Sequence, residues 1–242
     1  MARRSEAIVE RREPLSRERV LRAAMDLADR DGLDALSMRN LAAELGVEAM
    51  SIYYYFKSKD ELLAGMKDLV MMEVELPEGR PSEWKASLRG TVMSYYNALR
   101  RHKWVNGIRL SPGNIQKVAT EGTSPGTIRY MESVLRRLRR AGFSARMTHH
   151  AYHILESHIV GSSMWIAGIE AVLPKGKELA ELARVVVARV PIAEYPYFHE
   201  HLGQHGGKMT KGDKSPFEIG LDLILDGLDR QRDEKPKRSR SR

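Results

Sequence analysis

Eight histidines are the residues best suited to acid–base or metal chemistry in this 242-residue chain. His149 and His153 stand four positions apart, which would place both imidazoles on one face of a helix. No glutamate completes an H-E-x-x-H pattern around them, and the chain has no cysteine to supply a thiolate. The polar segment 199–205 adds histidines that could bind a metal ion adventitiously. We therefore expect packed or surface histidines, no metal site and no cofactor.

A glycine- and lysine-rich segment, residues 206–215, has the composition of a phosphate loop. Its spacing does not fit G-x-x-x-x-G-K-[ST], and no strand pattern precedes it. The chain also shows no nucleophile placed beside a general base. These observations predict a protein that is not an enzyme.

The net charge of +8 is unevenly distributed along the chain. The last eight residues carry five of the basic charges, whereas residues 15–62 contain seven basic and nine acidic residues. Any nucleic-acid function must therefore depend on a motif and not on bulk charge. No apolar run is long enough to span a bilayer and the N-terminus does not fit a signal peptide, so we expect a cytoplasmic protein without a membrane partner.

Two short helical patterns that flank a glycine occupy residues 36–63. The first has apolar residues at i, i+3, i+4 and i+7, which define one helical face: Met38, Leu41, Ala42 and Leu45. Gly46 ends this helix, and Ile52 and Phe56 share one face of the next. Two helices joined by a glycine-containing turn of about 3–4 residues form a helix-turn-helix.

The residues of these segments resemble the DNA-binding domain of the TetR family of transcriptional regulators. The resemblance rests on Ser37–Ala42, Gly46–Glu48 and Tyr53–Lys59. The segments Ala141–Ser144 and Phe217–Leu228 also resemble the C-terminal domain of the tetracycline-repressor branch. The family implies an all-α fold, with an N-terminal three-helix DNA-binding domain that contains the helix-turn-helix and a C-terminal helical domain for ligand binding and dimerisation.

The function implied is a ligand-responsive, sequence-specific DNA-binding regulator, here a repressor that a small molecule releases from its double-stranded operator. The alternative is a helical small-molecule-binding protein or enzyme that carries a vestigial helix-turn-helix. The absence of a catalytic or cofactor motif argues against this alternative.

The expected DNA contacts lie around the second helix of the motif. Ala49, Met50 and Ser51 begin the recognition helix, whose N-terminal end enters the major groove in this geometry. The N-terminus of the preceding helix favours phosphate, and it contains Ser37, Met38 and Arg39. The family resemblance adds at least one tyrosine hydroxyl and a lysine as phosphate contacts, drawn from Tyr53, Tyr54, Tyr55 and Lys59. The alternative is that the tyrosines only pack.

Four parts of the chain follow from composition and periodicity. Residues 1–14 form a flexible arm, either disordered or touching DNA, and residues 15–75 form the DNA-binding domain with a connecting helix from Ser58 to about Glu75. Residues 82–230 form the effector-binding and dimerisation domain, with residues 191–215 as a mobile loop. Residues 231–242 form a basic disordered tail.

Two helices of the C-terminal domain predict a homodimer. The long helix after Ser144 carries a seam with steps of 3 and 4 that suits a partner helix, and the last helix is apolar on two sides. The interface residues expected are Leu155, Ile159, Ile166, Ile169, Ile219 and Leu223. The alternative is a monomer with a thicker core.

An apolar or aromatic effector is expected inside this domain, between stripes that point inward. Such a mix of apolar walls and a few polar groups is usual for ligand pockets. The residues expected to line it are Tyr95, Leu99, Trp104, Met131, Leu135, His158 and Trp165. The alternative for each of them is that it fills the core.

Overall fold

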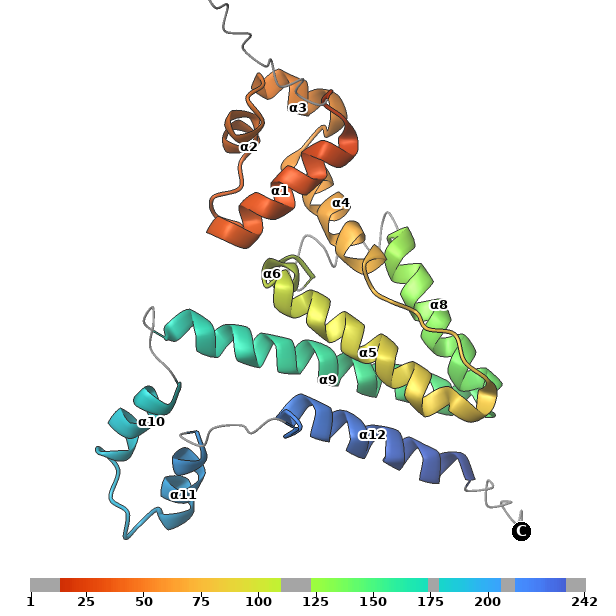
Figure 1. Ribbon diagram of the computed structural model, residues 1–242, viewed down its shortest axis with the longest axis vertical. Coiled ribbons are helices and arrows are strands. Elements are labelled where there is room, and N and C mark those ends of the chain that lie inside the picture. Colours follow the sequence, from red (N-terminus) through yellow and green to blue (C-terminus); the bar gives the residue numbers. More distant parts are fainter. Residues whose placement is uncertain (1–13, 110–122, 174–178, 206–211, 234–242) are drawn as a thin grey trace, which may run out of the picture. The chain divides into compact units, whose positions relative to one another are not determined.

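The computed structural model describes residues 14–109, 123–173, 179–205 and 212–233, and all its regular elements in these ranges are helices. The arm, the tail and the glycine- and lysine-rich segment discussed above lie wholly or mainly outside the described residues. Figure 1 shows the element order. The bounds are α1 Arg17–Asp31, α2 Met38–Leu45, α3 Ala49–Tyr55, α4 Lys59–Met72, a 3-10 turn Pro81–Glu83, α5 Trp84–Arg101, α6 Trp104–Arg109, α8 Pro125–Arg140, α9 Ala145–Val172, α10 Leu179–Val187, α11 Pro196–Gln204 and α12 Pro216–Asp233.

The chain forms two compact units, Met1–Leu69 and Val70–Arg242. The division falls inside α4, ahead of the Leu76–Pro81 segment where the sequence indicated a domain boundary.

The N-terminal unit contains α1 to α3 and most of α4, and its caps follow the sequence. The Ser16 hydroxyl accepts a hydrogen bond from the Arg19 N–H at 3.1 Å, which caps α1. Gly46 ends α2 with φ at 66°, a left-handed conformation that glycine adopts without strain. Ile52 and Phe56 are fully buried, so the helix-turn-helix is held by the apolar faces that the periodicity predicts.

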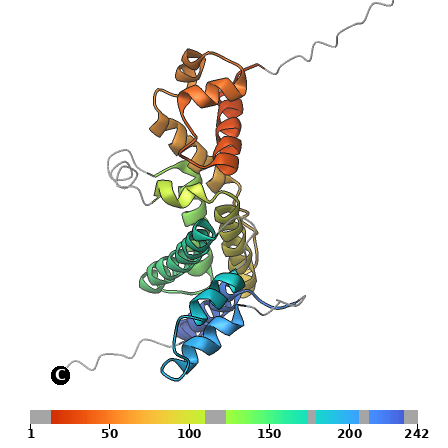
Figure 2. The same ribbon diagram turned by 90° about the vertical axis from the view of Figure 1, so that its left-hand side faces the viewer.

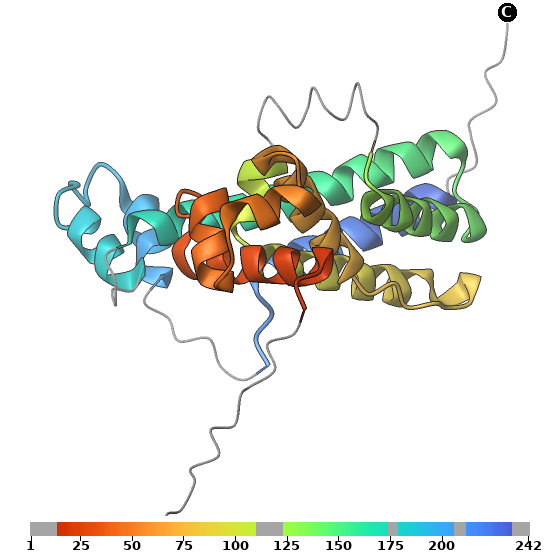
Figure 3. The same ribbon diagram turned by 90° about the horizontal axis from the view of Figure 1, so that it is seen from above.

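The C-terminal unit is built around α9, a helix of 28 residues that contacts α5, α8 and α12. It runs the length of the unit and ends near α10 and α11 (Figures 1 and 3). Ion pairs join α5 to α12 along one side. They connect Arg89 with Glu218 and Asp222, and Lys85 with Asp226 and Asp229.

Three sequence predictions of local structure are wrong in their details. The connecting helix α4 ends at Met72 and not at Glu75. Residues 196–204, predicted as part of a loop, form α11, which begins with Pro196 at a position where proline is tolerated and packs against α10 (Figure 2). The last helix continues to Asp233, three residues into the stretch predicted as a disordered tail, and ion pairs of Asp229 with Lys85 and Arg232 stabilise its last turns.

Among the described residues, no helix is long and apolar enough to cross a membrane.

The packing of α9 against α12 depends on a glycine. The His158 ring stacks on Phe217 at 4.6 Å between centroids and its Nε2 lies 2.9 Å from the Phe217 carbonyl oxygen. Phe217 in turn stacks on Tyr96 at 3.6 Å. A Cβ atom at Gly220 would lie 2.5 Å from the His158 ring, which these contacts hold in place.

Replacing Gly220 with alanine is therefore expected to lower the free energy of unfolding by about 1–3 kcal/mol, since overpacking outweighs the gain in helix propensity. Chemical denaturation measures it. Gly203→Ala on α11 is the control, because no atom lies within 4 Å of a Cβ there and the change should be neutral or slightly stabilising. Equal stability of the two variants would contradict this account.

Candidate functional site

The recognition helix α3 presents a strongly exposed outer face. Met50 and Tyr54 are 74% and 76% exposed, and Tyr53 is 39% exposed. Ala49 and Ser51 are half-buried, and the buried residue of the helix is Ile52. Large apolar and aromatic side chains that the single chain leaves exposed, on the second helix of a helix-turn-helix, have the exposure that contact with base edges and phosphates requires.

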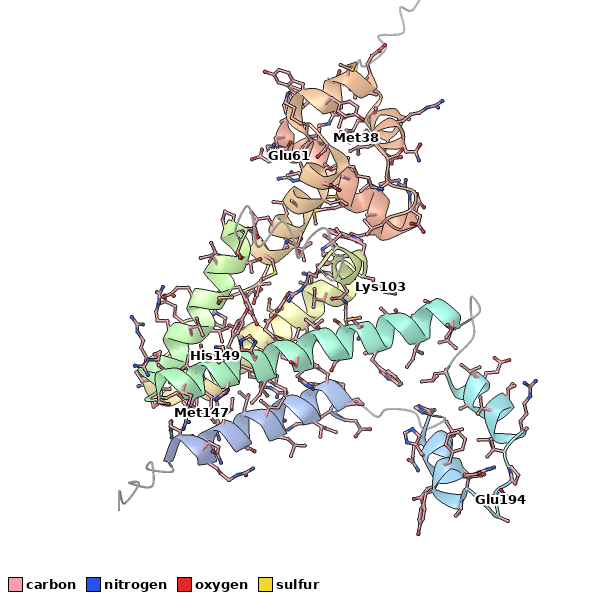
Figure 4. All side chains as sticks on the ribbon, turned by 180° about the vertical axis from the view of Figure 1, so that it is seen from behind. Met38, Glu61, Lys103, Met147, His149 and Glu194 are labelled. Atoms are coloured by element: carbon pink, nitrogen blue, oxygen red, sulfur yellow. The ribbon has the colours of Figure 1, made fainter. Side chains whose placement is uncertain are left out.

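Two of the residues predicted to touch DNA instead hold the N-terminal unit together. The Tyr55 hydroxyl donates to the Leu15 carbonyl at 2.7 Å, which ties α3 to the chain before α1. The Met38 side chain, at the start of α2 (labelled in Figure 4), is 8% exposed, because it shares its helical face with the buried Leu41 and Leu45. Only the backbone of Met38 is therefore left for a phosphate contact.

The charged residues around the motif are exposed, and the capping residue is half-buried. The Ser37 hydroxyl caps α2 by accepting from the Asn40 N–H at 3.0 Å, which satisfies one of the N–H groups at the helix N-terminus. Arg39 is exposed on the first turn of α2. Lys59 is also exposed, and its Nζ lies 3.5 Å from the Leu33 carbonyl.

The side chains of Ser58 and Glu61 cap the start of α4. The Ser58 hydroxyl accepts from the Glu61 N–H at 3.1 Å. The Glu61 carboxylate accepts from the Lys57 N–H at 2.8 Å and not from Ser58, so the reciprocal half of the capping box is shifted by one residue. This bond and the Arg17 guanidinium lower the pKa of Glu61 below its ordinary value, in spite of partial desolvation.

The residues predicted to line an effector pocket separate into three groups. Tyr95, Leu99 and Trp104 are buried, and Met131 and Leu135 are half-buried on α8. His158 makes the packing contact between α9 and α12 described above. Trp165 is 72% exposed, which corrects the prediction: it lies two positions after the buried Ser163 and so on the opposite face of α9.

A buried polar cluster, which the sequence analysis missed, surrounds Tyr95. The Tyr95 ring lies 4.8 Å from the Tyr130 ring, and the Arg109 guanidinium lies 5.7 Å from the Tyr95 centroid. Arg109 also donates to Glu156 at 3.0 Å. Burial and then the Glu156 charge raise the pKa of Tyr130 well above its ordinary value, and the same two causes raise the pKa of Tyr152. The sequence did contain a sign of this cluster. Glu156 is a charged residue within the apolar stripe of Leu155 and Ile159, where a carboxylate requires a polar partner.

Several buried polar atoms of the C-terminal unit have no hydrogen-bond partner among the residues that the structure describes. They include the Tyr95 hydroxyl, Oδ1 of Asn106 and the Thr148 hydroxyl. The amide nitrogen of Asn106 donates to the Ser163 hydroxyl at 3.0 Å, so this amide is held with its oxygen unused. A buried polar atom without a partner costs about 1–3 kcal/mol. Such a group in a native protein requires an explanation, and a bound molecule is one.

The residues predicted for the dimer interface also divide. Leu155 and Ile159 are 1% and 0% exposed, because the α9 seam faces the chain's own helices and not a partner. Ile166 and Ile169 are half-buried. The other two predicted residues, Ile219 and Leu223 on α12, are 49% and 67% exposed.

Comparison with known proteins assigns the family. Residues 76–232 match the model of the tetracyclin repressor-like C-terminal domain, and residues 20–66 match that of the bacterial regulatory proteins of the tetR family. The transcriptional repressor DrrR1 of Streptomyces coeruleorubidus is 32% identical over 228 residues, 89% of this chain and 77% of that protein. The class C tetracycline repressor of Escherichia coli is 28% identical, covering 90% of this chain and 92% of that protein.

Solved structures agree with this assignment. The TetR family protein ActR of Streptomyces coelicolor, in complex with actinorhodin, is similar with a TM-score of 0.69 and 25% identity, over 92% of this chain and 100% of that chain. This chain belongs to the TetR family of bacterial transcriptional regulators. It is a ligand-responsive DNA-binding transcriptional repressor and not an enzyme, as the sequence analysis predicted.

Proposed function

We propose that the protein acts as a homodimer on a pseudopalindromic operator and leaves it when an aromatic small molecule with polar substituents enters the cluster around Tyr95. The observation that carries this proposal is the set of partnerless polar atoms in the C-terminal unit. The DNA-contacting side chains would be those of Met50, Ser51, Tyr53, Tyr54 and Arg39, with Lys59 on a phosphate. Operator binding would place the protein with the DNA in the cytoplasm.

The dimer is supported by apolar surface that the single chain leaves exposed. On α12, Leu221 and Leu225 face the core, while Ile219 and Leu223 are offset by two positions and point to the other side. A hollow of about 330 Å³ on this side is lined from α9 by Met147 and Ile154 and from α12 by Leu223 and its neighbours. A contiguous exposed apolar surface typically marks an interaction site, and two-fold symmetry of a protein is mirrored in its operator.

The effector chemistry is suggested by the atoms left without partners. Oδ1 of Asn106 only accepts hydrogen bonds, whereas the Tyr95 hydroxyl can donate or accept. The aromatic rings of Tyr95 and Tyr130 supply a flat apolar surface beside them. A ring system that carries hydroxyl and carbonyl groups would satisfy both. ActR is known in complex with actinorhodin, and a TetR variant of Acinetobacter baumannii in complex with minocycline, so these two molecules are the first probes.

The Tyr95 hydroxyl, which has no partner among the described residues, leads to a prediction about the stability of the ligand-free protein. Tyr95→Phe is expected to leave the free energy of unfolding unchanged or raise it by up to about 1 kcal/mol, because it removes a buried group without a partner. Tyr55→Phe, the matched control, should lower it by about 0.5–1.5 kcal/mol, because that hydroxyl donates to Leu15. Urea denaturation of the two variants measures the difference, and a Tyr95→Phe protein destabilised as much as Tyr55→Phe would show that the Tyr95 hydroxyl is already satisfied.

The function itself is tested by release of DNA. An operator duplex selected from random sequences should be bound by the protein and released by the probe molecule, as measured by fluorescence anisotropy. Asn106→Leu should still bind the duplex but respond at least about tenfold less to the probe, since one good polar contact corresponds to roughly 1.4 kcal/mol or more. Loss of duplex binding in Asn106→Leu, or an unchanged response, would count against the proposed site.

A further inference from the structure

A cavity of the C-terminal unit has a lining that shares no residue with the cluster around Tyr95. It has a volume of about 220 Å³ and is enclosed by the Leu76–Pro81 segment, the start of α5 and one face of α8. Its described lining includes one carboxylate, that of Glu78, and five arginines: Arg80, Arg129, Arg136, Arg137 and Arg140. We call this cavity the arginine pocket.

The spacing of residues on α8 brings its cations together. Arg129, Ser133, Arg136 and Arg140 follow each other at steps of 4, 3 and 4, so they share one helical face. Like charges at such spacing cost about 0.2–0.5 kcal/mol per pair. The helix dipole favours cations in the last turn and so offsets the cost for Arg137 and Arg140. It gives no such benefit to Arg129, which stands near the N-terminal end.

Neighbouring carboxylates neutralise two of the five arginines. Arg80 donates to Glu83 at 2.6 Å, and Arg136 lies 3.3 Å from Glu132. Both pairs are largely exposed, and exposed ion pairs contribute little to stability. The other three arginines, Arg129, Arg137 and Arg140, therefore account for most of the positive charge of the pocket.

These three guanidinium groups have mainly neutral partners. Arg129 donates to three backbone carbonyls at the end of α4, at 2.9–3.2 Å, and its Nε is buried without a partner. Arg137 donates to the Thr91 hydroxyl. Burial lowers the pKa of Arg137, and the Glu78 charge offsets part of this effect. For Arg140, which is exposed, the described part of the chain offers no carboxylate partner.

We propose that the arginine pocket binds a compact multivalent oxyanion, either a phosphate-bearing or a polycarboxylate small molecule, through Arg137 and Arg140. A guanidinium presents paired N–H donors that match the oxygens of phosphate or carboxylate. The volume is below the range of about 300–1,000 Å³ usual for drug-sized ligands, which suits a small anion. No residue of the pocket belongs to the cluster around Tyr95, so this site would be a second one, separate from that of the aromatic effector.

Isothermal titration of the full-length protein with pyrophosphate and with citrate, at constant ionic strength in chloride, tests the proposal. We expect saturable binding of one anion per chain, and the tighter of the two identifies the ligand class. The double variant R137Q/R140Q should weaken this binding at least about tenfold. Because Arg137 contacts Thr91 and its loss could disturb folding, R140Q alone is tested beside it, with thermal unfolding of each protein, and should weaken binding several-fold.

The matched control is R146Q/R189Q, which removes the same net charge at two exposed positions outside the pocket. It should bind the anion as the unmodified protein does, and every variant keeps the basic tail. Equal weakening in the control and the pocket variant would mean that the anion responds only to overall charge. That result, or the absence of saturable binding of either anion, would overturn the proposal.

Discussion

Replacing Tyr54 with alanine is expected to weaken operator binding by about 5- to 150-fold, which corresponds to the 1–3 kcal/mol that a good specific DNA contact contributes. The Tyr54 side chain is 76% exposed, and in the described part of the chain its ring contacts the neighbouring Tyr55 ring, at 5.1 Å between centroids. The free energy of unfolding should therefore change by less than about 0.5 kcal/mol. Fluorescence anisotropy on the selected operator and urea denaturation measure the two quantities.

The same substitution at Tyr197, which is 83% exposed on α11, provides the control and should leave operator affinity unchanged. A Tyr54→Ala protein that unfolds more easily would show that Tyr54 belongs to the core of the N-terminal unit. Full operator affinity in this variant would remove Tyr54 from the DNA interface and would leave Met50, Ser51 and Tyr53 as the candidates on α3.

Replacing Leu223 with aspartate is expected to dissociate the dimer. Leu223 is 67% exposed in the single chain, so the folded monomer can accept a carboxylate there. In the proposed dimer the same carboxylate would be buried without a partner, at a cost of several kcal/mol. Light scattering at micromolar protein should then report the mass of one chain, 27.5 kDa, where the unmodified protein has twice that mass. Operator binding should fall with it, because one half-site alone holds a monomer weakly.

Ile128→Asp is the matched control, since Ile128 is an exposed apolar residue at 55% but lies on α8, away from the proposed interface. This variant should remain a dimer with its operator affinity intact. If the unmodified protein is already monomeric, or if Leu223→Asp stays dimeric, the interface on α12 is wrong. Dissociation by both variants would point instead to a general loss of stability.

Local patterns in the sequence were sufficient to predict the helix-turn-helix. Helix caps such as Ser16 and Ser37 and the left-handed Gly46 act within a few residues of themselves, so their effect can be deduced from neighbours along the chain. The same holds for the start of α9, which follows its cap Ser144 as predicted. The family of this chain was also recognisable from the residues of the motif, and the comparisons confirm it.

Periodicity does not determine which of several apolar helix faces packs against other helices of the same chain. Leu155 and Ile159 are buried because their face of α9 packs against other helices of the unit, whereas Trp165, on the opposite face, is exposed. The role of Tyr55 likewise depends on the Leu15 carbonyl, 40 residues away.

The buried cluster was decided by tertiary structure alone. Tyr95, Arg109, Tyr130 and Glu156 come from four different helices, and no spacing within one segment records that they meet. The sequence by itself determined the helices, the DNA-binding motif and the family, since these follow from short-range hydrogen bonding and helical periodicity. The packing of helices far apart in the chain decided which polar groups lost water without gaining a partner, and hence where a ligand is expected.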